Sequence, residues 1–355
     1  MSENRSVIGY VSVTSTDVKC PGCGTSIGVR FNPATATLTC PFCGLSTKLT
    51  TPQDGAAAQE LDFNSALQRA SVDWGHYKKI IVCSNCGGQT VYDAEQVTGA
   101  CPFCGSTSVA PAPEINQIMA PNAVIPFSFS KEQAQNCFLN FVKKKRLVIK
   151  KVFDCKLENV VGIYLPYWTF DAFTASTYYG FYYDSDTTPY DLVTGALYQN
   201  FDDILIPASN IRHPFISKVT DYDFTKAVPF SAGYLAGIPA VRYTLGLNEG
   251  WECSKKHIAE KLKKDVNKSN RDLRIKGIVT NYYNVKFRCL MAPVYLAQYR
   301  FGEKVFQVAI NGQTGKTYCD VPTKIKRIIV LGSLGILIGA ALEVLLIWLY
   351  AWLFG

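Results

Sequence analysis

The 355-residue chain lacks the motifs of the common enzyme classes. It contains no HExxH zinc-protease pattern and no GxSxG nucleophile elbow, and its middle region has no pair of carboxylates in a signature context. Four aspartates of that region lie in polar stretches typical of turns, at Asp184, Asp186, Asp202 and Asp203. The three histidines, His76, His213 and His257, show no ligand-like spacing. The sequence therefore predicts a protein that is not an enzyme.

A phosphate-binding loop is also missing, although "NGQTGKTY" at Asn311 to Tyr318 contains Gly-Lys-Thr. A P-loop begins with a glycine five positions before its final glycine, and that position is Ile310. Strand-like residues both precede and follow the segment, and Asn-Gly and Thr-Gly tolerate the positive φ of tight turns. The segment therefore predicts a hairpin turn.

No secretory signal opens the chain, so we expect its N-terminal part to stay in the cytosol. The end of the chain differs, because residues 328–354 contain a single charge, Glu343. Such a helix exceeds the roughly 30 Å of a bilayer core. Basic residues precede it and none follows it, which places the N-terminal part in the cytoplasm. This pattern predicts a single-pass, tail-anchored protein of the cell membrane.

The same apolar segment carries a helix-packing pattern. Gly335 and Gly339 form a GxxxG, and Glu343 lies four residues further along the same face. Small residues let two helices approach closely, and a carboxyl group at that depth is relieved by a hydrogen bond from a neighbouring helix. We expect this face to pack against a membrane partner or a second copy, which would give a homo-oligomer.

The net charge of +8 would suggest nucleic acid or anionic lipid as a partner. Eight zinc-bound thiolates and two zinc ions would reduce it to about +4, which is a mild excess of positive charge. For one basic run we predict contact with anionic lipid, with a solvated helix end as the alternative: Lys143, Lys144, Lys145, Arg146, Lys150 and Lys151. The cysteine-rich region has few basic residues, so nucleic acid is not the favoured partner.

Eight of the 13 cysteines form two sets of paired C-x₂-C knuckles. The first set is Cys20, Cys23, Cys40 and Cys43, and the second is Cys83, Cys86, Cys101 and Cys104. This spacing brings four sulfurs to one tetrahedral ion and predicts two structural zinc ions, because four sulfurs leave no open coordination position. The glycine after each second cysteine lets the chain turn. The five scattered cysteines are expected to be buried thiols.

The pattern of elements divides the chain into six segments and predicts an α+β fold class. These are zinc ribbon 1 (residues 15–50), a connecting helix (51–77), zinc ribbon 2 (78–110), a linker (111–122), an antiparallel-sheet-rich α+β domain (123–322) and the transmembrane helix (328–354). The α+β domain is predicted to contain two helices, one with Ser130 as its N-cap and Ala134, Phe138, Phe141 and Val142 on one face, and one over residues 253–268 with Ile258, Leu262 and Val266 on one face. Each helix precedes a strand with an internal proline, Pro166 or Pro293. We interpret this as a duplicated helix-plus-sheet unit; coincidence is the alternative.

Several motifs together resemble a bacterial family of zinc-ribbon membrane proteins, often labelled as TFIIB-type zinc ribbon or as primosomal or phage-replication-like. The motifs are the paired "CPxCG" knuckles, "DWG", "IPFSFSKEQA", "YLPYWTFDA" and "NGQTGK". The resemblance implies envelope-stress partners that are similar to phage-shock protein A or to SPFH (flotillin-like) proteins. The favoured function is a non-enzymatic membrane-anchored adaptor that recruits such partners. The alternative is a nucleic-acid-binding zinc-ribbon protein linked to replication.

Overall fold

The computed structural model describes most of the chain between residues 121 and 323 and shorter parts on either side. The described residues are 12–13, 18, 20–25, 28–49, 58–63, 65, 78–83, 89–93, 109–111, 121–145, 148–183, 189–209, 213–238, 240–241, 243–270, 273–323, 339 and 343.

One sheet of eight strands dominates the described structure. Its main path runs β11 (Pro189–Pro207), β10 (Leu157–Tyr183), β13 (Arg274–Phe301), β14 (Lys304–Asn311) and β15 (Thr317–Cys319), all antiparallel. Three short strands, β5 (Leu61–Asp62), β9 (Ala123–Val124) and β12 (Val228–Pro229), attach at its side. β10 and β13 have 27 and 28 residues, and both are rich in the aromatic and β-branched side chains that favour strands.

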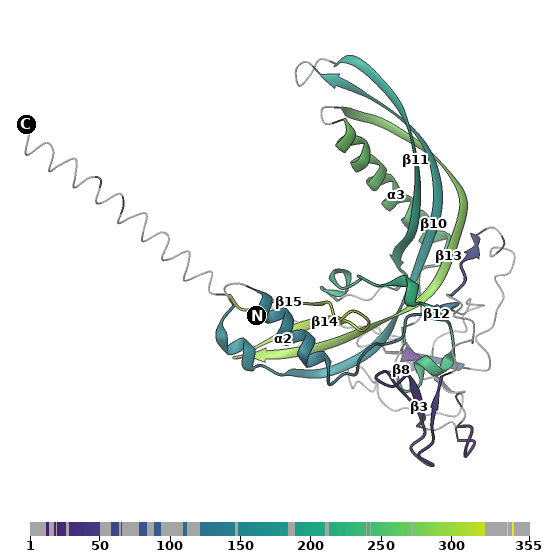
Figure 1. Ribbon diagram of the computed structural model, residues 1–355, viewed down its shortest axis with the longest axis vertical. Coiled ribbons are helices and arrows are strands. Elements are labelled where there is room, and N and C mark those ends of the chain that lie inside the picture. The colour runs from purple at the N-terminus through teal and green to yellow at the C-terminus, as the bar shows by residue number, and fades with distance from the viewer. Residues whose placement is uncertain are drawn as a thin grey trace, which may run out of the picture.

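The long strands bend where both neighbours of β10 bulge. Asp202 and Asp203 of β11 together face Asp171, and Asn284 and Val285 of β13 together face Ala172. Asp203 and Asn284 have positive φ values of 50° and 52°. Extra residues in a strand bend it and increase its twist. Beyond this double bulge β10, β11 and β13 continue as a curved three-stranded ribbon, which we call the arm (Figure 1).

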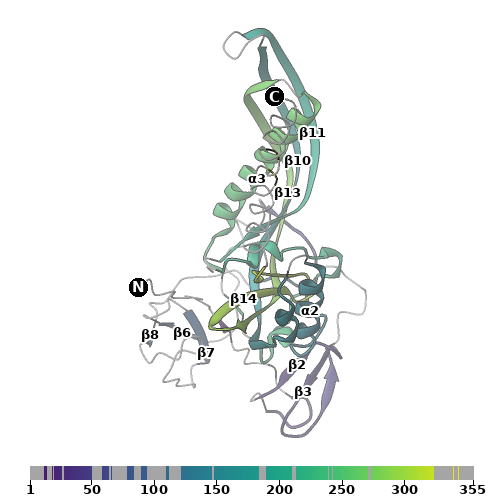
Figure 2. The same ribbon diagram turned by 90° about the vertical axis from the view of Figure 1, so that its left-hand side faces the viewer.

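Two hydrophobic cores lie against the sheet, and the smaller one extends across the bend. The larger core lies at the base, where α2 (Ala134–Lys144) packs beside β14 and β15 and buries Ala134, Phe138 and Val142. The smaller core lies under α3 (Leu247–Ser269), which covers the concave side of the arm with Ile258, Leu262 and Val266 (Figures 1 and 2).

The two helices agree with the sequence pattern in their buried faces and differ in their starts. α2 begins at Ala134 and Gln133 is its N-cap, whereas the sequence predicted Ser130. α3 begins at Leu247, several residues before the predicted helix, because Glu249 accepts a hydrogen bond from the backbone of Gly246 at 2.8 Å. Four 3₁₀ turns complete the base: η1 (Lys150–Asp154), η2 (Ile216–Lys218), η3 (Phe224–Lys226) and η4 (Ala232–Leu235).

The proline-containing strands that suggested a duplication are neighbours in the sheet. Tyr164 of β10 faces Pro293 of β13, and Pro166 faces Met291, so the two prolines occupy equivalent positions about a two-fold axis through the pair Leu165 and Ala292. Each strand also follows a helix and continues into a hairpin, which gives the order β11-β10-β13-β14. This arrangement supports the interpretation as a repeated helix-plus-hairpin unit.

Two small sheets carry the cysteine-rich segments. β2 (Arg30–Asn32), β3 (Thr37–Thr39) and β4 (Ser46–Lys48) form ribbon 1. β1 (Ser12–Val13), β6 (Lys78–Cys83), β7 (Gln89–Asp93) and β8 (Val109–Pro111) form the backbone of a second sheet in the order β1-β7-β6-β8.

The Gly-Lys-Thr segment is a hairpin turn, as the sequence predicted. β14 and β15 pair on either side of it, the backbone N–H of Asn311 donates to Lys316 at 2.8 Å, and Gly315 has a φ of 72°. The Asn311 side chain accepts from the backbone of Gln313 and Thr314 and donates to Val219. The turn therefore has a structural role in the base of the sheet.

The predicted fold class requires correction, because the structure is mostly β-sheet and the prediction of an α+β protein with a transmembrane helix is wrong. Within the described residues no helix combines the length and apolar character needed to cross a membrane. α2 has 11 residues, which span only about 17 Å, and α3 carries charges along its exposed side. This finding overturns the single-pass, tail-anchored location. The predicted segment 328–354 lies outside the described residues except for Gly339 and Glu343, which are helical and exposed.

Candidate metal centre

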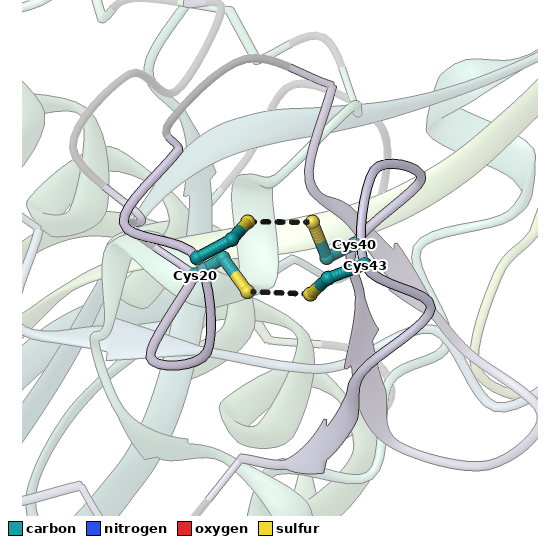
Figure 3. A group of neighbouring side chains, drawn as sticks. Cys20, Cys40 and Cys43 are labelled. Atoms are coloured by element: carbon teal, nitrogen blue, oxygen red, sulfur yellow. Dashed lines mark hydrogen bonds between the residues drawn. The ribbon is translucent and has the colours of Figure 1, made fainter.

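Four cysteines of ribbon 1 come together as the knuckle spacing predicted. Cys20 and Cys23 lie on the first knuckle and Cys40 and Cys43 on the second, and their sulfur atoms all lie within 4.8 Å of one another. The Sγ atoms of Cys20 and Cys43 are 3.5 Å apart, and those of Cys23 and Cys40 are 3.7 Å apart. Figure 3 shows the two pairs facing each other between the knuckles.

Local backbone geometry explains why each knuckle folds back on itself. Gly24 and Gly44, which follow the second cysteine of each pair, have φ values of 74° and 69°. Their N–H groups donate to the carbonyls of Cys20 and Cys40 at 2.8 and 3.0 Å. Glycine adopts this left-handed conformation at little cost. The β2–β3–β4 hairpins then hold the second knuckle opposite the first.

The four thiols lie close enough together to shift one another's pKa values. The backbone N–H of Cys23 is the largest of several contacts that lower the pKa of Cys20, to about 6. At Cys43 the backbone N–H of Leu45 lowers the pKa, but the sulfur of Cys20 and burial outweigh it and raise the pKa to about 12. Four sulfurs therefore cannot all ionise together near neutral pH without a cation between them.

The geometry fits a single tetrahedral metal ion. A tetrahedron with zinc–sulfur bonds of about 2.3 Å has edges of about 3.8 Å, close to the two sulfur–sulfur distances above. The structure thus brings together one complete predicted set of metal ligands. Of the second set, the structure describes only the backbone of Cys83, the last residue of β6, while Cys86, Cys101 and Cys104 lie outside the described residues.

Ribbon 1 is joined to the base of the large sheet. Phe31 of β2 is buried in the larger core, and its ring lies 5.4 Å from that of Tyr234 in an edge-to-face contact. Its backbone N–H donates to Ala236 at 2.9 Å. The opposite end of the ribbon faces solvent, where Phe42 is 67% exposed and Leu45 is 40% exposed. Ribbon 1 is therefore attached to the base through Phe31, while Phe42 and Leu45 of the second knuckle present apolar side chains outward.

The other predicted site residues do not gather around this centre. The lysines predicted to contact lipid, Lys143, Lys144, Lys145, Lys150 and Lys151, are exposed at the end of α2 and in η1. The ammonium group of Lys145 lies 4.9 Å from the Phe141 ring centre. Arg146 and Gly335 lie outside the described residues. A side chain at Gly339 would meet nothing within 4 Å.

A charged cluster at the double bulge was missed by sequence reasoning. Asp202 and Asp203 were expected in turns but lie within β11, and Asp203 forms an ion pair with Arg288 of β13. Arg288 is buried and also lies 3.4 Å from Glu60, which contacts Lys286 at 3.3 Å. No local pattern links these residues, because they come from segments far apart in the chain.

Asp171 completes this cluster and is the member with the strongest change in proton affinity. Its carboxylate accepts from the backbone N–H of Asp203 at 2.8 Å and lies within 4.8 Å of Glu60 and Asp202. Burial is the main cause that raises the pKa of Asp171 to about 7, and the neighbouring carboxylates add to it. Arg288 and Lys286 supply positive charge to the same group, so the cluster is balanced largely from within.

The buried His213 has a structural role. Burial lowers the pKa of His213 to about 4, so the ring is neutral, and its Nδ1 accepts from the backbone N–H of Phe215 at 3.3 Å. It stands beside a cavity of about 490 Å³ that Asp203 and His257 also line. Among the described residues these three side chains do not approach closely enough to share a metal ion.

Comparison with known proteins finds one similar bacterial chain. An uncharacterized protein of Bacillus subtilis (strain 168), YdjG, is 26% identical over 325 residues, which cover 86% of this chain and 89% of the relative. No protein-family model and no solved structure matches the chain. The likeness therefore extends over most of the chain, and it assigns no activity.

Proposed function

We propose that this protein is a non-enzymatic adaptor whose zinc-bound ribbon binds a protein partner. The observation that carries the proposal is the exposure of Phe42 and Leu45 on a ribbon that is fastened at its other end by the buried Phe31. An apolar side chain on a rigid support loses little conformational entropy on binding. Such a side chain can therefore serve as an anchor residue that inserts into a pocket of the partner.

The metal in this proposal is structural zinc. Four sulfurs fill the coordination sphere, so the ion has no position for a water molecule or a substrate. Its role would be to fold a segment of about 30 residues that cannot build a sufficient core by itself. The second cysteine set has the same spacing, and we propose that it holds a second structural zinc ion.

The charge of ribbon 1 favours a protein partner over nucleic acid. Residues 15–50 contain four charged side chains, Asp17, Lys19, Arg30 and Lys48, with a net charge of +2. Four thiolates and one divalent ion reduce this charge to about zero. Binding to nucleic acid depends on neutralising several phosphates, for which this charge is small. The resemblance noted above suggests SPFH (flotillin-like) or phage-shock-protein-A-like partners.

The experiment is a binding titration of the purified full-length chain with one purified protein of each of these two types. We expect Phe42→Ser to weaken binding at least tenfold with an unchanged zinc content. Val305→Ser is the matched control, since Val305 is a similarly apolar and exposed residue on β14.

Two outcomes would contradict the proposal. One is that neither protein binds the wild-type chain. The other is that Phe42→Ser binds as tightly as Val305→Ser. A parallel titration with duplex DNA at low salt tests the alternative, which strong binding with steep loss at higher salt would favour.

A further inference from the structure

The outer face of the arm carries no charged side chain over four rows of its strands, from the row of Phe173 to the row of Tyr179. The segments 172–183, 192–201 and 277–285 contain no Asp, Glu, Lys or Arg, although 18% of all residues in the chain are charged. A solvated sheet face normally alternates polar residues with the buried ones. The absence of charge along three neighbouring strands therefore needs an explanation.

The strand register shows which of these residues share the outer face. Directly paired residues point to the same side of a sheet. Ala175 lies between Tyr198 and Asn281, the next row on this face places Thr177 between Ala196 and Val279, and the rows alternate with those that face α3. Tyr283 and Tyr179 belong to further rows of the same face, and Leu192 lies in the row at its far end, where Phe181 separates it from Arg274.

These side chains are exposed. Tyr198 is 69% exposed and Val279 is 64% exposed, and Leu192, Tyr179 and Tyr283 are each about half exposed. α3 covers the concave side of the arm, and no described element covers the convex side (Figure 1). The face is thus an uncharged surface, rich in exposed aromatic and apolar side chains, on the outside of the described structure, which is typical of an interaction site.

The size of the face indicates the kind of association it supports. Nine residues of a strand extend about 30 Å and three strands are about 14 Å wide, so the face covers about 400 Å². Two such faces would bury roughly 800 to 900 Å², below the 1,200 Å² of a standard interface and in the range of weak, reversible complexes.

We infer that the convex face of the arm is a homodimer interface, in which it packs against the same face of a second copy. The absence of charged side chains on this face favours a second copy of the chain as the partner. A chain with a net positive charge, +8 by formal count and about +4 with two bound zinc ions, repels another copy of itself, and an uncharged face is the surface on which two copies meet without adding to that repulsion. A different partner would need no such restriction, since charge complementarity usually guides hetero-association.

The edge of the arm is compatible with this arrangement. β11 is the terminal strand of the sheet and pairs with β10 alone among the described strands. Two sheets that pack face to face keep their strands within about 30° of each other. Such packing leaves the β11 edge free and needs no change in the backbone of either copy.

The test is the oligomeric state of the full-length chain, measured by sedimentation equilibrium between about 1 and 300 µM, the range expected for weak interfaces. We expect a reversible monomer–dimer equilibrium for the wild type. Tyr198→Lys should weaken the dimer at least tenfold, because it places like charges in a desolvated interface. Val305→Lys, at an exposed site on β14, should leave the equilibrium unchanged.

A mixing experiment separates this effect from a folding defect. Tyr198→Lys and Tyr198→Glu chains should each be mainly monomeric, and an equimolar mixture of the two should recover dimers. A wild-type chain that remains monomeric over the whole range would overturn the inference and leave the face to a different protein. Dimers that Tyr198→Lys does not weaken would place the interface elsewhere.

Discussion

Ribbon 1 and the arm are both small β structures that project from the base, yet different forces hold them together. Ribbon 1 has a core cluster of only three buried residues, Cys20, Val29 and Cys40, two of which are metal ligands. The arm instead packs against α3, a helix of 23 residues, through the smaller core, which runs across the bend and includes Trp251, Phe170 and Phe287.

The comparison shows how chain length decides the source of stability. A segment of about 30 residues exposes too much of its surface to be held by apolar burial alone, so a metal supplies the missing free energy. The arm brings together strands far apart in the chain, which lets it bury large side chains without a metal. Loss of metal should therefore affect the two regions very differently.

The largest expected effect is that of a missing metal ligand. Cys40→Ser removes one sulfur of ribbon 1, and structural zinc sites contribute on the order of 10 kcal/mol to folding. We expect the variant to bind one zinc ion fewer than the wild type, measured by elemental analysis, and amide exchange in residues 20–49 to increase strongly. Exchange in α3 should stay slow.

Cys253→Ser is the control, because Cys253 lies on α3 away from the four sulfurs. Equal zinc content in Cys40→Ser and the wild type would contradict the assigned ligand set. Fast exchange throughout α3 would contradict the independence of the arm.

A smaller effect is expected where ribbon 1 meets the base. Phe31→Ala removes a buried ring from the larger core and should lower the free energy of unfolding by about 3 kcal/mol. Because Phe31 binds no metal, the variant should keep its zinc. Urea unfolding together with zinc analysis measures both. A fully stable variant would show that the ribbon contact contributes little, and a zinc-free one would show that the contact is needed for the metal site.

The smallest effect concerns the charged cluster where the arm begins. The folded state raises the pKa of Asp171 from 3.8 to about 7, so it holds the proton more tightly than the unfolded state does. This contribution to stability is fully present below about pH 4 and is lost as the pH rises through 7. Asp171→Asn keeps an acceptor for the Asp203 N–H and removes the charge.

We therefore expect Asp171→Asn to be more stable than the wild type by about 1 kcal/mol at pH 8 and equally stable near pH 4, since the site is half exposed and partly screened. Thermal unfolding across this pH range is the measurement. Asp191→Asn, at an exposed position of β11, serves as the control. A stability difference that does not change with pH would show that Asp171 is ionised in the folded state.

The sequence by itself determined the features that depend on residues close together in the chain. The C-x₂-C pairs with their glycines specify two knuckles, the Asn-Gly and Thr-Gly steps specify a turn, and the apolar spacing in α3 specifies the face that is buried. Each depends on backbone conformations or periodicities set within a few residues. These predictions were confirmed for ribbon 1, for the β14–β15 hairpin and for the buried side of α3.

Tertiary structure decided the features that depend on long-range pairing. The expected connecting helix gave no sign that Phe63 would pack against Trp251 and Phe287 in the arm. The cluster of Glu60, Asp171, Asp203 and Arg288 exists because two neighbouring strands bulge opposite one segment of β10. The uncharged outer face likewise becomes one surface only when the register aligns three strands. Register over such distances is set by the packing of whole faces, which no local pattern encodes.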